Sequence, residues 1–283
     1  MSEVAPVFFE RGSVQCGYCK REVDVWEACR NLVRNNAGSY NGLTSFGGQY
    51  TTFTTKLARN ELKEIVFSQH GIPEDAVLLQ ASFYPQRRDC CNPLFSPGPY
   101  LPQTLTRKVL LFGQPLEGDA QEERIAVGVT WVPFHDDFKE SWIYLTEAFI
   151  AWASQKHWNV ILPAYVAFEI ALIRIVESAM EQRLSKGIIS DFAKDGLTSS
   201  IALNVILPLL CDASNVKRLP DSIRGELNRL RKLRNKLVHD GLAKDAVSKP
   251  LASDMLCAAV FGFEYLRYAE GVLNVVADRI NPS

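Results

Sequence analysis

The order of apolar and polar positions changes near residue 135 and divides the chain into two regions. Before that point, turn-rich segments separate short runs that are rich in β-branched and apolar residues. We expect strands over three of these runs, at 76–83, 107–112 and 124–132. We also expect one helix over 55–70, which Gly71 would end. The pattern predicts a small α+β domain over residues 1–135, with long irregular loops.

Beyond residue 135, apolar residues recur at helical spacing almost throughout. Asp136 and Asp137 are suitable N-terminal caps for the first helix, and Gly187 and Gly241 are suitable stops for two later ones. We expect helices at 140–158, 164–187, 188–195, 198–211, 221–241 and 252–278. Residues 136–283 are therefore predicted to form an all-α bundle, which makes the whole chain α+β.

One of these helices carries an arginine inside its apolar face. At about 100° per residue, a continuous stripe is formed by Leu227, Leu230, Leu233, Leu237 and Val238. Arg234 lies within this stripe, whereas a solvated cation normally occupies the opposite side of a helix. Asn235 and His239 are one turn apart beside the stripe, so their side chains are expected to meet.

These three polar residues together suit chemistry at a phosphodiester. Arg234 would bind phosphate with its planar fork, His239 would transfer a proton near neutral pH, and Asn235 would orient them. One imidazole cannot easily serve both the attacking and the leaving oxygen, so a two-fold dimer would supply a second copy of the site. The structural alternative is an arginine that reaches solvent from the stripe edge and a histidine that caps the helix.

Positive charge is concentrated around these residues, although the formal net charge of the chain is only −1. Eight basic residues lie between Lys217 and Lys236, against two acidic ones, Asp221 and Glu226. Such a cluster attracts a polyanion. The predicted RNA contacts are Arg229, Arg231, Lys232 and Lys236. The alternative is that these charges only solvate one face of the helix.

Arg234, Asn235 and His239 spell R-N-x-x-x-H, and this segment resembles the motif helix of HEPN domains. The apolar helix YVAFEIALIRIVESAM resembles the first helix of that bundle, which often carries a glutamate facing the motif. Glu169 would be that residue, with Glu177 as the less favoured candidate. The resemblance covers roughly residues 140–280. It implies a dimeric endoribonuclease that needs no metal or other cofactor for catalysis, and such domains recur in toxin–antitoxin pairs and antiviral systems. Many relatives instead serve as binding or dimerisation modules.

The cysteines suggest a separate feature in the first domain. Cys16 and Cys19 form a CxxC that looks like one knuckle of a structural zinc site, which needs four ligands. No second CxxC is present, and the nearby candidates for the other two ligands are Cys29, His70, Cys90 and Cys91. Two unpaired thiols in a turn are the alternative. By analogy with HEPN proteins that carry such a unit, the first domain would act as a sensor or regulatory unit.

Composition limits the class of protein. Hydrophobic residues make up 47% of the chain and charged residues 22%, which is ordinary for a globular protein. Neither a secretory signal nor a run of about 20 uninterrupted apolar residues is apparent, so we expect a cytoplasmic protein with no membrane partner. The expected partners are RNA, a second copy of the chain, and an antitoxin or defence-system protein. The alternative function is a non-catalytic RNA- or protein-binding module.

Overall fold

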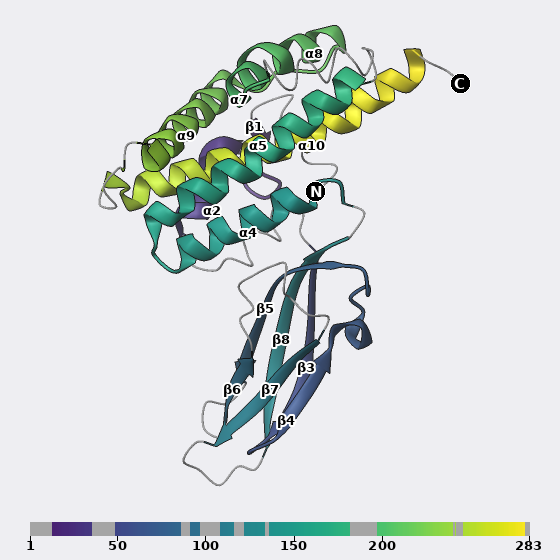
Figure 1. Cartoon of the computed structure of the whole chain (residues 1–283), viewed down its shortest axis with the longest axis vertical. Helices are drawn as coiled ribbons and strands as arrows, with labels where there is room; N and C mark the ends of the chain where they lie inside the picture. Colours follow the sequence, from purple (N-terminus) through teal and green to yellow (C-terminus); the bar gives the residue numbers. More distant parts are fainter. Residues whose placement is uncertain are drawn as a thin grey trace. The chain divides into compact units, whose positions relative to one another are not determined.

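The computed structural model describes residues 13–35, 49–85, 91–96, 108–115, 122–133, 136–181, 197–239, 241 and 246–280. By its internal contacts the chain forms two compact units (Figure 1). Met1–Gly42 and Glu147–Ser283 make up one unit, which is mainly helical, and Leu43–Thr146 make up the other. The chain thus combines α and β structure, with its helices concentrated toward the C-terminal end, and this confirms the expected α+β class.

The second unit contains two three-stranded antiparallel sheets. The first has the order β3 (Gln49–Ala58), β8 (Glu122–Val132), β5 (Val77–Pro85), and the second has the order β4 (Leu62–Val66), β7 (Lys108–Pro115), β6 (Cys91–Ser96). Strands of both sheets supply the buried core, which includes Leu57, Ile65, Leu78, Leu111 and Val127. The strands expected at 76–83, 107–112 and 124–132 correspond to β5, β7 and β8.

The helix expected over 55–70 is wrong. Residues of β3 alternate between buried and exposed along the strand, with Phe53 and Leu57 turned toward the core. Asn60 then adopts a left-handed φ of +58°, and the Glu61 N–H donates to the Ala58 carbonyl at 3.2 Å, so the chain reverses into β4. A single 3₁₀ turn, η1 (Phe67–His70), ends at Gly71, whose φ is +84°. Only the predicted stop at Gly71 is confirmed.

Helices build most of the other unit. They are α4 (Lys139–Ala153), α5 (His157–Glu181), α7 (Ser199–Ile201) continuing through the π-helical η3 (Ala202–Ile206) into α8 (Leu207–Ala213), α9 (Asp221–His239) and α10 (Lys249–Ile280). The division between the units, at Thr146 and Glu147, falls within α4. These helices follow the expected pattern, whereas the helix predicted at 188–195 and the stop at Gly187 lie outside the described residues.

Backbone geometry explains where two of the helices end. After α4, the Lys156 N–H donates to the Ala151 carbonyl at 2.9 Å, and Gln155 adopts a left-handed φ of +58°. After α8, Val216 and Asn215 repeat this arrangement, with a bond of 2.8 Å from the Val216 N–H to the Cys211 carbonyl. Both are Schellman caps without glycine. The expected helix over 140–158 therefore breaks, and α5 begins at His157 with Pro163 inside it.

Helix α10 packs against both α5 and α9 (Figure 1). Gly262 makes this possible, because a Cβ there would lie 2.8 Å from the Phe168 ring of α5 and 2.9 Å from Leu227 Cδ1 of α9. Eleven residues of α5 are buried. Among the described residues α5 alone is long and apolar enough to cross a membrane, and this degree of burial is that of a core helix in a soluble protein.

The first segment of the chain belongs with the helical unit. It comprises a hairpin of β1 (Ser13–Gln15) and β2 (Glu22–Asp24), followed by α2 (Val25–Asn35), which packs against α10. Arg30 donates to Asp254 Oδ1 at 3.1 Å, and the rings of Trp26 and Phe261 meet edge to face with centroids 4.9 Å apart. This division differs from the boundary expected at residue 135, because α2 packs on α10, which lies more than two hundred residues later in the sequence.

Candidate nucleic-acid site on α9

Helix α9 carries the polar residues that the sequence singled out. Its first turn is closed by a bond from the Arg224 N–H to the Pro220 carbonyl at 3.0 Å. The apolar stripe is buried at Ile223, Leu227 and Leu230, but it leaves the core toward the end of the helix. Val238 is 52% exposed there. The polar residues of interest therefore lie where the apolar face of α9 emerges from the bundle.

Arg234 is half-buried against α5. Its guanidinium carbon lies 5.4 Å from the centroid of the Tyr165 ring, within the range of a cation–π contact. Its Nη1 donates to Asn235 Oδ1 at 3.0 Å. Among the described residues, its buried Nε has no hydrogen-bond partner. The arginine within the stripe is thus held by an aromatic face from α5.

Tyr165 connects Arg234 to two further residues. Its hydroxyl donates to Glu169 Oε1 at 2.7 Å and lies 2.6 Å from Ser199 Oγ. Because a phenol has one proton and gives it to the carboxylate, the Ser199 hydroxyl must be the donor in the second bond. Burial of the hydroxyl raises the pKa of Tyr165 to about 12, and the bond to Glu169 contributes in the same direction. The phenol therefore stays protonated at neutral pH.

Glu169 is linked to α9 only indirectly, through Tyr165. Glu169 and Tyr165 are one turn apart on α5, so the carboxylate fixes the hydroxyl while the ring supports Arg234. The sequence did not single out Tyr165 or Ser199. For Tyr165 a signal existed, since it stands four residues before Glu169 on the same face. No pattern in the sequence indicates Ser199, because this residue reaches α5 only through tertiary packing.

Among the described residues, no hydrogen bond joins Asn235 and His239. The Asn235 side chain accepts from Arg234, and His239 is exposed at the end of α9, without a hydrogen bond or ion pair to any described residue. The expectation that the two side chains meet is not confirmed. Gly241 follows with a left-handed φ of +62°, as the predicted helix stop required.

The predicted RNA contacts divide into two groups. Arg229 forms an ion pair with Glu226 at 3.4 Å, and the upstream Arg224 pairs with Asp221 at 2.7 Å. Three other cations have no carboxylate partner among the residues that the structure describes: Arg231, Lys232 and Lys236. Together with Arg234 they concentrate unpaired positive charge in the last turns of α9.

A pair of asparagines sits upstream of these cations. Asn204 Nδ2 donates to Asn228 Oδ1 at 3.1 Å, and Asn228 Nδ2 donates to Asn204 Oδ1 at 2.9 Å. Asn204 lies in the π-helical η3, where the widened turn re-aims side chains relative to an α-helix. This reciprocal amide pair joins η3 to α9 beside the candidate site.

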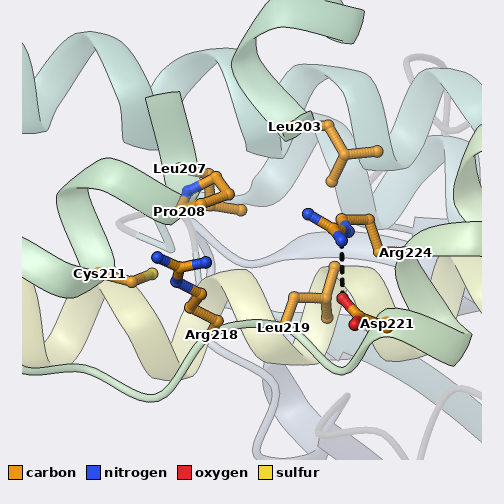
Figure 2. Close-up of a pocket in the computed structure, with 8 residues that line it drawn as sticks. All are labelled: Leu203, Leu207, Pro208, Cys211, Arg218, Leu219, Asp221 and Arg224. Atoms are coloured by element: carbon orange, nitrogen blue, oxygen red, sulfur yellow. Dashed lines mark hydrogen bonds and ion pairs between the residues drawn. The ribbon is translucent and has the colours of Figure 1, made fainter. Parts of the chain in front are cut away.

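A small pocket lies nearer the start of α9 (Figure 2). It is lined by Leu203, Leu207, Pro208, Cys211, Arg218, Leu219, Asp221 and Arg224. Its internal volume of about 20 Å³ admits about one water molecule. Arg224 pairs with Asp221 across it, Arg218 is paired with Asp212, and burial raises the pKa of the Cys211 thiol. These charges are already compensated, so the pocket is not built to receive an anion.

The predicted metal ligands Cys16 and Cys19 lie in the turn of the β1–β2 hairpin, and both are free thiols. Of the other candidates, His70 stacks on Phe53 in the sheet unit, with ring centroids 3.6 Å apart. Cys90 and the side chains of Cys29 and Cys91 lie outside the described residues. Within the described part of the chain, no group of three or more potential ligands could hold a metal ion.

No protein-family model, curated protein or solved structure matches this chain. The geometry of α9 and its neighbours is therefore the basis for inferring function.

Proposed function

We propose that the chain is a HEPN-type endoribonuclease that cleaves RNA with side chains alone, and that a second copy of the chain completes its site. The observation that carries this proposal is the position of Arg234. An arginine held against Tyr165, five residues before an exposed histidine at the end of the same helix, supports a phosphate-binding cation near a proton-transfer group.

The reaction follows from these roles. His239 would take the proton from an RNA 2′-hydroxyl, whose oxygen then forms a bond to the adjacent phosphorus. The bond from phosphorus to the 5′-oxygen breaks, and the partner copy's imidazole would supply the proton to that leaving oxygen. Arg234 would stabilise the charge on the non-bridging oxygens, and Asn235 would hold its guanidinium in place. The products are a 2′,3′-cyclic phosphate and a 5′-hydroxyl.

The charge of α9 supports a polyanionic substrate. Arg231, Lys232 and Lys236 lack carboxylate partners among the described residues, so they are available for phosphates on either side of the cleaved bond. Arg229, which is paired with Glu226, would contribute less. Binding should therefore weaken as the salt concentration rises.

Exposed apolar side chains support a second copy at this face. Val238 follows Arg234 by about one turn on α9, and on α5 Leu162 precedes Tyr165 by about one turn. Leu162 is 45% exposed and Trp158, one turn earlier, is 38% exposed. Apolar groups that flank a polar site on two helices are typical of an interaction surface. A symmetric dimer is the simplest occupant, and it would bring two His239 side chains to one RNA.

The test is RNA cleavage by purified protein in EDTA, with total RNA as substrate and the product ends mapped. His239→Ala and Arg234→Ala should abolish cleavage while circular dichroism and the oligomeric state stay unchanged. His157→Ala, which removes another histidine of the same unit, is the matched control and should cleave like the wild type. Cleavage by His239→Ala at the wild-type rate would contradict the proposal.

Two observations favour a second candidate function. Arg234 is half-buried against Tyr165 and His239 has no described partner, which also suits a non-catalytic module whose arginine is structural. Such a module would bind RNA, or an antitoxin or defence-system protein, without cutting. It predicts salt-dependent RNA binding by the wild type with no cyclic-phosphate product under any tested condition.

A further inference from the structure

The N-terminal hairpin holds two thiols in a fixed turn that the proposed ribonuclease site does not use. Strands β1 and β2 pair in the register Ser13↔Asp24, Val14↔Val23 and Gln15↔Glu22. The Cys16 N–H donates to the Arg21 carbonyl at 2.8 Å, and the Lys20 N–H donates to the Cys16 carbonyl at 2.9 Å. Lys20 takes a left-handed φ of +59° to close the turn. The CxxC is therefore held by backbone bonds within a built turn.

The turn holds Cys16 and Cys19 at one end of the hairpin, because the bond from the Lys20 N–H to the Cys16 carbonyl closes a loop that contains both residues. Two cysteines separated by two residues are a spacing typical of structural zinc sites, which bind cysteine as the thiolate.

The tip of this turn is exposed. Cys19 is exposed, and Tyr18, between the two cysteines, is 98% exposed. The described residues offer no third ligand near the pair. A structural zinc ion takes four ligands in a tetrahedron, so two thiolates are half of a site.

We propose that Cys16 and Cys19 provide two of the four thiolates of a zinc site, and that the same hairpin of a second copy provides the other two. The ion then lies on the two-fold axis of the pair. Four thiols lose their protons to form the site, and its excess negative charge lies beside Lys20 and Arg21 of each turn. This proposal uses a second copy, as the proposed function does, but it does not depend on RNA cleavage.

The experiment measures zinc in the full-length protein, reduced, loaded with Zn²⁺ and freed of unbound metal. Elemental analysis should give about one zinc per two chains, and native mass spectrometry should show two chains carrying one ion. Cys16→Ser and Cys19→Ser should each lose the zinc, while the His239→Ala protein should retain it. A Cys90→Ser/Cys91→Ser double variant is the matched control and should bind zinc like the wild type.

A second measurement needs no variant. With zinc bound, Cys16 and Cys19 should resist alkylation by N-ethylmaleimide, and they should react rapidly after the metal is removed with a strong chelator. Peptide mapping identifies the protected residues. Three results would each overturn the proposal. They are one zinc per single chain, loss of zinc from the Cys90→Ser/Cys91→Ser protein, and a wild type that holds no zinc.

Discussion

The guanidinium carbon of Arg234 lies 5.4 Å from the centroid of the Tyr165 ring, and this contact joins the motif helix α9 to the core helix α5. Tyr165 is itself held by Glu169 and Ser199. A cation that would otherwise reach solvent from the stripe edge is thereby fixed in one place. A fixed cation loses less conformational entropy when it binds a phosphate than a flexible one does.

Tyr165→Phe should separate the two roles of this tyrosine. The ring under Arg234 remains, but the half-buried Glu169 loses its donor, so we expect a loss of about 1–2 kcal/mol in the free energy of unfolding. Tyr165→Ala removes the ring as well and should cost about 3–5 kcal/mol. Denaturant titration measures both values. Equal stability of the wild type and Tyr165→Phe would show that the hydroxyl contacts contribute nothing.

The same residue predicts an alkaline effect. The pKa of Tyr165 is raised to about 12 from an ordinary value of 10.0, so the unfolded chain loses this proton more readily than the folded one. The stabilising contribution is complete below pH 10 and is lost as the pH rises toward 12. The stability advantage of the wild type over Tyr165→Phe should therefore shrink across that range. Other tyrosines cancel in this comparison, and an advantage that grows with pH would contradict the assignment.

Arg234→Lys should lower both the stability and the cleavage rate, although it keeps the positive charge. Lysine keeps the charge but lacks the planar group that lies over Tyr165 and donates to Asn235. We expect a stability loss of about 0.5–1 kcal/mol. If the proposed function holds, single-turnover cleavage should fall nearly as far as in Arg234→Ala. Lys232→Ala is the matched control on the exposed side of α9, and its stability should change by less than about 0.5 kcal/mol.

Much of the helical unit could be predicted from sequence, because its signals are local. The helical spacing of apolar residues predicted α9 and α10, and Gly241 predicted the end of α9. The candidate site was found for a similar reason: Arg234 contradicts the pattern of its own helix. Glu169, which the sequence also singled out, accepts from the Tyr165 hydroxyl, and its role at the site stays a prediction.

The remainder depends on contacts that no local pattern reveals. The packing of α2 on α10 rests on Arg30 and Asp254, which are 224 positions apart. The prediction of a helix over 55–70 was wrong. Its charged residues recur at helical spacing, but the threonine-rich start of β3 favours a strand. Ser199 reaches Tyr165 only because α7 lies against α5.

The amide pair between η3 and α9 should show strong energetic coupling. Asn204→Ala or Asn228→Ala leaves the other amide partly buried without its partner, so each should cost about 1–2 kcal/mol. The double variant should cost little more than either single one, with a coupling energy of about 0.5–3 kcal/mol in a double-mutant cycle. Additive losses would show that the two side chains act independently.

Two glycines of α10 should respond to alanine in opposite directions. At Gly262 the added methyl group would lie 2.8 Å from the Phe168 ring and 2.9 Å from Leu227 Cδ1, so α5, α9 and α10 must move apart. We expect a loss of about 1–3 kcal/mol. At Gly271 the same methyl group meets no atom within 4 Å, and alanine favours the helix by about 0.5–1 kcal/mol. Thermal and denaturant unfolding of both variants measure the difference. If the close packing of these helices also positions Arg234, Gly262→Ala should weaken RNA binding, whereas Gly271→Ala should leave it unchanged.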